Sequence, residues 1–375
     1  MEKSSFEYTW YMPTKIVSGR DCVKNNAMLL SPLGKCALIV TGKSSAANGS
    51  LADMCATLRE NGQEFEVFDE VTPNPVVTCV QKGAAKAREM RADFIVGIGG
   101  GSPMDAAKAI AALARQPRTD EEIFSGGWSE DILPVVAVPT TAGTGSEVTP
   151  YAIVTNDFKR TKTSLSAPEM FPKLAFLDGK YMLSLPRNTT IHTAIDALSH
   201  AVEGMFTTKS TPQGDLAALE SIRLLFGIFP KLQASSALSL SERDTLLYAS
   251  MLAGTVIAQA GTTAVHTLGY ALTYHYGTDH GEANGVLLGE MLALAEERLP
   301  ERTEKILRAA GTKDAEEFGR VLKLLLKGHI RYPREALIRY AEEAADSPKL
   351  KGTTYFRDKE DLLRIYLKSD IVKEA

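Results

Sequence analysis

The alternation of apolar runs with helical segments in the first half of the chain most restricts the possible fold. Four apolar runs predict β-strands, at residues 36–40, 64–68, 93–98 and 133–138. Helical patterns separate these runs, at residues 50–61, 77–90 and 103–115. Apolar strands that alternate with helices predict a mostly parallel sheet covered on both faces. Residues 1–186 are therefore predicted to form a doubly wound, Rossmann-like α/β nucleotide-binding domain.

The pattern changes near residues 185–188, where the strand signals stop. Six long helical patterns follow, at residues 191–206, 214–229, 241–261, 283–297, 300–310 and 315–327. Residues 187–375 are therefore predicted to form an all-α domain, which also carries the histidines.

Composition and charge restrict the class of partner. The net charge is −4 and there is no long basic run, which argues against nucleic acid or an anionic membrane. No apolar stretch approaches the roughly 20 residues that cross a bilayer, and the N-terminus lacks the apolar core of a signal peptide. The four cysteines form no C-x-x-C pair, as is typical of reduced thiols in a cytoplasm. We expect a cytoplasmic protein that acts on a small molecule.

A glycine-rich turn at residues 97–105 joins a predicted strand to a helix. Glycines let the backbone approach a phosphate closely, and amides at the helix start point at the anion; these glycines include Gly99, Gly100 and Gly101. Ser102 is predicted as the N-cap, and Asp105 completes a capping-box-like pair with it. The usual G-x-G-x-x-G is not matched because Ser102 stands at its last glycine position. A simple capped turn is the alternative.

A second polar loop, PTTAGTGSE at residues 139–147, follows the next predicted strand. Its threonines, serine and glycines can donate hydrogen bonds to a phosphate or a ribose. Ligands of open α/β sheets bind at the carboxyl ends of the strands. Two such loops on consecutive strands predict a bound dinucleotide, although each alone could be an ordinary polar loop.

The histidines of the second half include a candidate metal-ligand set. Asp196 and His200 lie four residues apart, which places them on one face of a helix. His266 follows later, and His280 stands just before another predicted helix. One carboxylate and three imidazoles would suit Fe²⁺ or Zn²⁺ and leave coordination positions open. Taken singly, each histidine is more often a core or surface residue.

These segments together resemble the iron-containing (group III) alcohol dehydrogenase family over essentially the whole chain. The motifs that carry the resemblance are GGGSPMDAAKA at 99–109, PTTAGTGSEVTP at 139–150, FLD at 176–178, DALSHAVEG at 196–204 and DHGEANGVLL at 279–288. The sequence is most similar to the propanediol and butanol dehydrogenase branch.

The resemblance implies a dehydroquinate synthase-like fold, an active site in the cleft between two domains, and a homodimer. It implies one divalent metal, Fe²⁺ with Zn²⁺ possible, bound by Asp196, His200, His266 and His280. It also implies cofactor contacts from the Gly99–Gly101 turn. Further cofactor contacts are implied for Asn74, Ser102, Asp105, Thr140, Thr141, Thr144, Thr149 and Lys162.

The chain departs from the family pattern beside the third metal ligand. Many members carry a histidine four residues after it, and here that position is Tyr270. A histidine relay at that point is therefore in doubt, and the Tyr270 phenol is a candidate catalytic group in its place. His275 lies nearby and is a second candidate.

The predicted reaction interconverts a small primary alcohol or diol and its aldehyde. The metal would act as a Lewis acid on the alcohol oxygen, and a hydride would pass to the nicotinamide. One alternative is a lyase of the dehydroquinate synthase type, which should need many basic residues for its anionic substrate. Residues 191–290 hold only four, Lys209, Arg223, Lys231 and Arg243. A reductase of a phosphonoaldehyde or hydroxy acid and a non-catalytic nucleotide-binding module also stay open.

The segment after the first strand of the predicted sheet bears on cofactor choice. Dehydrogenases that select NAD usually place a carboxylate there, beside the ribose hydroxyls. Here the strand continues into Thr41-Gly42-Lys43-Ser44-Ser45, and no Asp or Glu follows until Asp53. Gly42 would leave room for a 2′-phosphate, Lys43 would offset its charge and Ser44 would donate a hydrogen bond. The sequence therefore predicts NADP(H) in preference to NAD(H).

Overall fold

The computed structural model describes residues 7–328 and 330–373, which group into two compact units. The sheet unit comprises Met12–Leu185 together with Ser239–Leu247. The helical unit comprises Pro186–Leu238 and the described residues from Tyr248 onward, together with residues 7–11. Each unit is described separately below.

The sheet unit is built on six parallel strands in the order β1-β8-β5-β4-β2-β3. The strands are β1 (Lys15–Ser18), β2 (Cys36–Thr41), β3 (Glu64–Phe68), β4 (Phe94–Gly99), β5 (Val135–Pro139) and β8 (Leu174–Leu177). The strand order reverses between β2 and β4, and ligands of open α/β sheets bind at such a switch point. The predicted doubly wound parallel sheet is confirmed.

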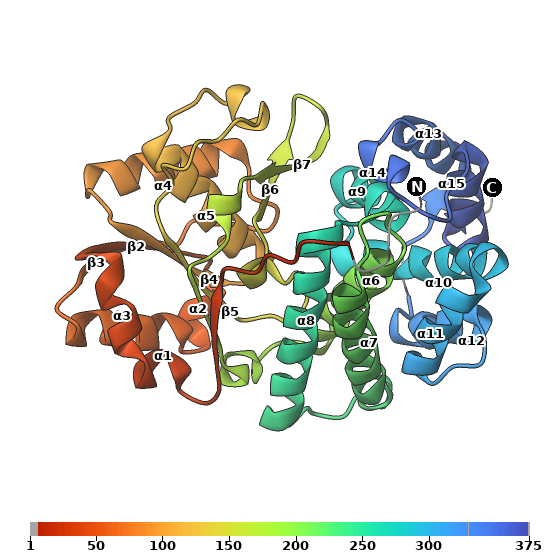
Figure 1. Cartoon of the computed structure of the whole chain (residues 1–375), viewed down its shortest axis with the longest axis horizontal. Coiled ribbons are helices and arrows are strands. Elements are labelled where there is room, and N and C mark those ends of the chain that lie inside the picture. Colours follow the sequence, from red (N-terminus) through yellow and green to blue (C-terminus); the bar gives the residue numbers. More distant parts are fainter. Residues whose placement is uncertain (1–6, 329, 374–375) are drawn as a thin grey trace. The chain divides into compact units, whose positions relative to one another are not determined.

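Helices cover both faces of this sheet (Figure 1). They are α1 (Cys22–Asn25), α2 (Ser44–Ala47), α3 (Ser50–Glu60), α4 (Val77–Glu89) and α5 (Gly101–Arg115). On β2, Ile39 belongs to one buried cluster with Met54 of α3, and Leu38 belongs to another with Val80 of α4. Because neighbouring strand residues point to opposite faces, both must be apolar here, and this explains the unbroken apolar runs in the sequence.

Two features of the sheet unit were missed by the sequence patterns. The strand β8 is only four residues long, and a short apolar run cannot be assigned by periodicity alone. An antiparallel hairpin of β6 (Tyr151–Asn156) and β7 (Thr161–Ser166) forms a separate two-stranded sheet. The β7 strand, TKTSLS, is mostly threonine and serine and carries no strong apolar signal, whereas β6, YAIVTN, starts with a short apolar run that the sequence patterns did not single out.

The helical unit is organised around α6 (Arg187–Met205), which contacts α7 and α10 extensively. Every residue from Ala194 to Met205 is buried, as expected of a helix at the centre of a core. The other helices in this half of the chain are α7 (Pro212–Gln233), α8 (Leu240–Ala260), α9 (Ala264–Tyr276), α10 (His280–Arg298), α11 (Pro300–Ala310), α12 (Ala315–Leu325), α13 (Arg334–Ala344), α14 (Pro348–Lys351) and α15 (Lys359–Lys368).

The sequence patterns did not predict α9, which carries His266 and Tyr270, nor the helices after residue 327. A parallel pair of two-residue strands, β9 (Tyr332–Pro333) and β10 (Val372–Lys373), is the other addition to the helical unit. In α9 the apolar positions run around most of the helix, so no amphipathic stripe marks it in the sequence.

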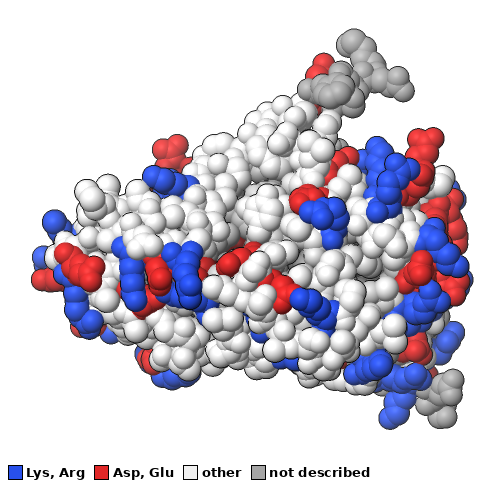
Figure 2. All heavy atoms as spheres, turned by 90° about the horizontal axis from the view of Figure 1, so that it is seen from below, with Lys and Arg blue, Asp and Glu red and all other residues white. Residues whose placement is uncertain are grey.

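Charged side chains of both signs are interspersed on the face shown in Figure 2. Among the residues that the structure describes, no helix is both long enough and apolar enough to cross a membrane.

Candidate active site

Three helices of the helical unit bring the four predicted metal ligands together. Asp196 and His200 lie one turn apart on α6, His266 lies in the first turn of α9, and His280 is the first residue of α10. The Nε2 atoms of His200, His266 and His280 lie 3.8, 3.7 and 3.6 Å from Asp196 Oδ1. Two ligand atoms that are each about 2.1 Å from one ion lie roughly 3 to 4 Å apart, so this spacing fits a metal.

The side-chain amide of Asn284 shows that these atoms converge on one point. Its Nδ2 lies 3.1 Å from Asp196 Oδ1, 3.2 Å from His266 Nε2 and 3.3 Å from His280 Nε2. One amide nitrogen therefore lies within hydrogen-bond distance of three of the proposed ligand atoms, which face a common point. A small cation bound by these atoms at about 2.1 Å from each would lie closer to them than this nitrogen does.

Burial makes a positive charge at this cluster favourable. Asp196 is 3% exposed, His200 5% and His266 2%, whereas the His280 side chain is 26% exposed. A buried carboxylate is costly unless an opposite charge compensates it. The donor set, its charge and its spacing thus fit a divalent cation, and the His280 side is the more open approach to it.

A second carboxylate lies behind His266. Glu203, also on α6, is completely buried and accepts a hydrogen bond from His266 Nδ1. Metal-bound histidines commonly use their other ring nitrogen in this way. The sequence contains Glu203 within the DALSHAVEG motif, but its contact with His266 depends on the packing of α6 against α9.

The two carboxylates shift the acid–base equilibria of the cluster. Burial would raise the pKa of Asp196, but His200 and His280, together with His266, hold it well below its ordinary value. Burial also opposes a charge on His266, yet the Glu203 and Asp196 carboxylates outweigh this effect and raise the pKa of His266. The cluster therefore attracts positive charge, whether a proton or a cation.

Tyr270 lies against the histidine cluster, as its place in the sequence suggested. Its ring stacks on His280 with the centroids 5.5 Å apart, and meets His266 edge-on at 6.4 Å. The ammonium of Lys349 lies 4.5 Å from the centre of the Tyr270 ring and 3.3 Å from Thr262 Oγ1. Lys349 was not anticipated, because it follows Tyr270 by 79 residues and belongs to no motif.

Two other histidines among the described residues lie outside the cluster, and His329 lies outside the described residues. His275 stacks on Tyr340 with the ring centroids 4.8 Å apart, so its ring packs away from the predicted relay position. His192 Nδ1 lies 2.8 Å from Asp279 Oδ2 and, with Glu282, forms a second group of potential ligand atoms. This second group is less buried, because Asp279 is exposed.

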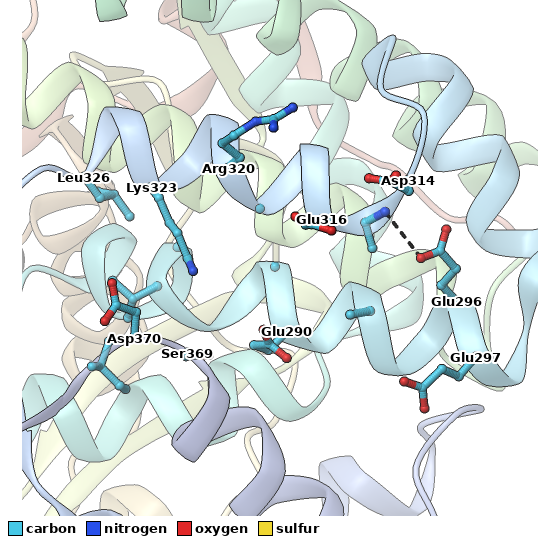
Figure 3. A pocket seen from close by; sticks show the side chains of 17 residues that line it. Glu290, Glu296, Glu297, Asp314, Glu316, Arg320, Lys323, Leu326, Ser369 and Asp370 are labelled. Atoms are coloured by element: carbon cyan, nitrogen blue, oxygen red, sulfur yellow. Dashed lines mark hydrogen bonds between the residues drawn. The ribbon is translucent and has the colours of Figure 1, made fainter.

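A groove between α10 and α12 has no histidine in its lining (Figure 3). Its lining is mixed, with Glu290, Arg320 and Lys323 among the charged side chains. The groove brings charges of both signs but no imidazole, so the histidine cluster is the better candidate for chemistry.

In the sheet unit, the β4–α5 turn has the form of a phosphate site. The helix begins at Gly101 with Gly100 as its N-cap, and no described side chain caps it. The predicted capping by Ser102 and Asp105 is therefore wrong, because the helix starts earlier than the sequence pattern suggested. The uncapped amides of the first turn of this 15-residue helix remain available for an anion.

The two predicted cofactor loops meet at close range. The Thr140 amide donates to the Gly99 carbonyl at 2.8 Å. A Cβ on Gly100 would lie 3.1 Å from Thr141 Oγ1, and one on Gly101 would lie 2.5 Å from Thr144 Cγ2. The glycines are thus required for the close approach, and the structure places Thr141 and Thr144 beside the helix start.

Two predicted contact residues face the protein interior instead. Asp105 accepts hydrogen bonds from Ser146 Oγ at 2.5 Å and from the Ile153 amide at 3.1 Å. Thr149 lies 3.4 Å from the ammonium of Lys108, which is fully buried and also donates to Ser146 Oγ at 2.7 Å. Burial lowers the pKa of Lys108 to about 8. This buried network joins α5 to Ser146 and Thr149, at the end of the second loop.

Asn74 contacts the β4–α5 turn, and Lys162 lies on β7 of the hairpin. The Asn74 amide donates to Ser102 Oγ at 3.1 Å, and its carbonyl accepts from Thr155 Oγ1 at 3.1 Å. Asn74 has a φ of 56°, a left-handed conformation that asparagine tolerates better than most residues. Lys162 lies opposite Thr155 in the hairpin, partly exposed.

The loop after β2 lies at the switch point of the sheet. A Cβ on Gly42 would lie 2.9 Å from the Val71 carbonyl oxygen, so the chain runs close there. Ser44 is exposed at the start of α2. The Lys43 ammonium pairs with Asp69 Oδ2 at 2.6 Å, and sequence reasoning missed this acid because it follows β3.

Comparison with known proteins identifies the family of the chain. Residues 13–179 match the family model for iron-containing alcohol dehydrogenase, and residues 190–328 match the model for the C-terminal part of that family. The NAD-dependent methanol dehydrogenase of Bacillus methanolicus is 31% identical over 303 residues, 80% of this chain and 78% of that protein. The 1,3-propanediol dehydrogenase of Klebsiella pneumoniae is 38% identical over 261 residues, 68% of this chain and 66% of that protein.

Solved structures lead to the same family. An iron-containing alcohol dehydrogenase from Thermotoga maritima superposes with a TM-score of 0.87 at 38% identity, covering 96% of this chain and 99% of that one. The chain therefore belongs to the iron-containing alcohol dehydrogenase family and is a metal-dependent alcohol dehydrogenase that uses a nicotinamide cofactor.

Proposed function

We propose that Asp196, His200, His266 and His280 hold one divalent metal, Fe²⁺ or alternatively Zn²⁺, for the oxidation of a small primary alcohol or diol. The observation that carries this proposal is the convergence of three of these side chains on the single amide nitrogen of Asn284. The names of the relatives, a methanol and a propanediol dehydrogenase, support a short alcohol or diol as substrate. They do not favour the lyase alternative.

The helical unit carries the proposed metal ligands, and the sheet unit carries most of the proposed cofactor contacts. Bound at the histidine cluster, the metal would supply Lewis acidity toward an oxygen, and the nicotinamide would supply the hydride acceptor. Asp196 and the three imidazoles position that charge. In the sheet unit, Gly99, Gly100, Gly101 and Ser102 present helix-start amides and a hydroxyl to the pyrophosphate. Thr140, Thr141, Thr144, Asn74 and Lys162 are proposed as further cofactor contacts, and Asp105 and Thr149 support the loops that carry them.

Metal removal tests the proposed metal site. Dialysis of the enzyme against a chelator should abolish alcohol oxidation, and Fe²⁺ or Zn²⁺ should restore it. His280→Ala should lower activity more than about a hundredfold, beyond the loss typical of residues that only support a ligand. His275→Ala is the matched control, because that ring stacks on Tyr340 outside the cluster. Full activity of the metal-free chain would contradict the proposal.

Tyr270 is proposed as the group that moves a proton to or from the substrate oxygen. Its ring stacks on His280, the most exposed of the four ligands, and its hydroxyl lies 3.5 Å from the Lys349 ammonium.

Replacement of Tyr270 by Phe separates a proton-transfer role from packing. We expect Tyr270→Phe to lower kcat by about tenfold to a hundredfold, the lower part of the range for a general acid–base group, and to alter the pH profile of kcat. Cofactor affinity should stay the same. An unchanged pH–rate profile would show that Tyr270 only packs against His280.

We further propose that the cofactor is NADP(H) in preference to NAD(H). No acidic residue lies between Gly42 and Ala52 in the segment after β2, and the exposed Ser44 can donate to a 2′-phosphate. The nearby acid, Asp69, forms an exposed ion pair with Lys43. The Bacillus methanolicus relative is named for NAD, so the argument depends on this chain's own residues.

A new carboxylate at Ser44 tests the cofactor preference. The unmodified enzyme should show a higher kcat/KM with NADP than with NAD. Ser44→Asp should lower the NADP/NAD ratio by about tenfold or more through repulsion of the 2′-phosphate, whereas the neutral Ser44→Asn should not. Position 44 is preferable to Gly42, where any side chain would press on the Val71 carbonyl. A higher kcat/KM with NAD in the unmodified enzyme would refute the proposal.

A further inference from the structure

Glu203 is a buried carboxylate that is not one of the four proposed ligands. It lies on α6, three residues after His200, and is 0% exposed. An ionised carboxylate at such a position requires several hydrogen bonds to offset its lost hydration. Both of its carboxylate oxygens accept hydrogen bonds from the start of α9.

One oxygen of Glu203 holds the beginning of α9. Its Oε1 accepts hydrogen bonds from the Thr263 and Val265 amides, each at 2.9 Å, and from the Thr263 hydroxyl. The Thr263 side chain itself does not cap the helix. Glu203 therefore caps α9 from a neighbouring helix, and its negative charge lies at the positive end of the helix dipole.

The other oxygen of Glu203 determines which ring nitrogen of His266 carries the proton. Its Oε2 accepts from His266 Nδ1, so the ring proton belongs on Nδ1. In a neutral imidazole the remaining nitrogen, Nε2, then carries a lone pair. That Nε2 is the atom 3.7 Å from Asp196 Oδ1.

We propose that Glu203 is a positioning residue that preorganises the metal site: it holds His266 in the tautomer whose Nε2 lone pair faces the ion. This inference rests on the proposed metal site. Because α6 carries Asp196, His200 and Glu203, this one helix would supply two ligands directly and orient a third through its carboxylate. The proposal predicts that metal affinity depends on the carboxylate of Glu203, although Glu203 does not touch the metal.

Glutamine is an informative replacement because it keeps the shape of Glu203 but not its pattern of acceptors. If its amide oxygen faces the Thr263 and Val265 amides, its NH₂ group faces His266 Nδ1 and favours a proton on Nε2. If it is turned the other way, its NH₂ group faces two backbone donors. The first orientation satisfies the hydrogen bond but moves the ring proton to Nε2, the atom that would face the ion. The second places a donor against backbone donors and leaves buried polar groups unsatisfied.

The test compares three variants of the full chain after metal removal. Zn²⁺ and Co²⁺ affinities are measured by competition with a chromophoric chelator, and the Co²⁺ visible spectrum reports the ligand set. Glu203→Gln should bind each ion about 10- to 100-fold more weakly than the wild type, the range typical for residues that support a metal ligand. Thr263→Val loses one contact to Oε1 but keeps the His266 contact, and should stay within about threefold. Glu220→Gln removes a carboxylate on α7 that pairs with Arg223, and should match the wild type.

The controls separate orientation of His266 from loss of the helix cap. Thermal unfolding shows whether each variant is folded at the temperature of the titration. A folded Glu203→Gln with affinity within about threefold of wild type and an unchanged Co²⁺ spectrum would overturn the inference. Equal weakening in Thr263→Val would also overturn it, because capping alone would then explain the loss. Absence of metal binding by the wild type would overturn the proposed metal site itself.

Discussion

The burial of charge beside α6 is the constraint on which the rest of the active site depends. Asp196 and Glu203 lie in the interior of the helical unit, where an uncompensated carboxylate costs several kcal/mol. The chain meets this cost with three imidazoles, the backbone amides at the start of α9 and, in the proposed holoenzyme, a divalent cation. The same groups that offset the charge also define a ligand set, so stability and function arise from one arrangement.

In the sheet unit, backbone amides are the groups available to bind a charged ligand. The α5 helix starts without a side-chain cap, and its amides remain for an anion. Glycines at the turn allow Thr141 and Thr144 to approach, and a buried network of Lys108, Asp105 and Ser146 holds the second loop beneath them. These interactions hold the two loops in place without a bound ligand.

The sequence predicted the parallel sheet and the Asp196–His200 pair because each leaves a local pattern: unbroken apolar runs and the Asp–x–x–x–His spacing. His266 and His280 were assigned to the same set through the family resemblance. It did not predict Lys349 beside Tyr270 or Asp69 beside Lys43, because these contacts join segments that share no motif. It misplaced the start of α5, since a serine before a proline resembles an N-cap whether or not the helix begins there. The dimeric state and the cytoplasmic location remain predictions from the sequence.

Anomalous scattering from crystals grown with Fe²⁺ or Zn²⁺ tests the central claim most directly. Data collected on either side of the absorption edge of the metal locate the ion independently of activity. We expect one strong anomalous peak per chain, within bonding distance of Asp196 Oδ1 and the Nε2 atoms of His200, His266 and His280. A peak at the second group, His192, Asp279 and Glu282, with none at the first would contradict it.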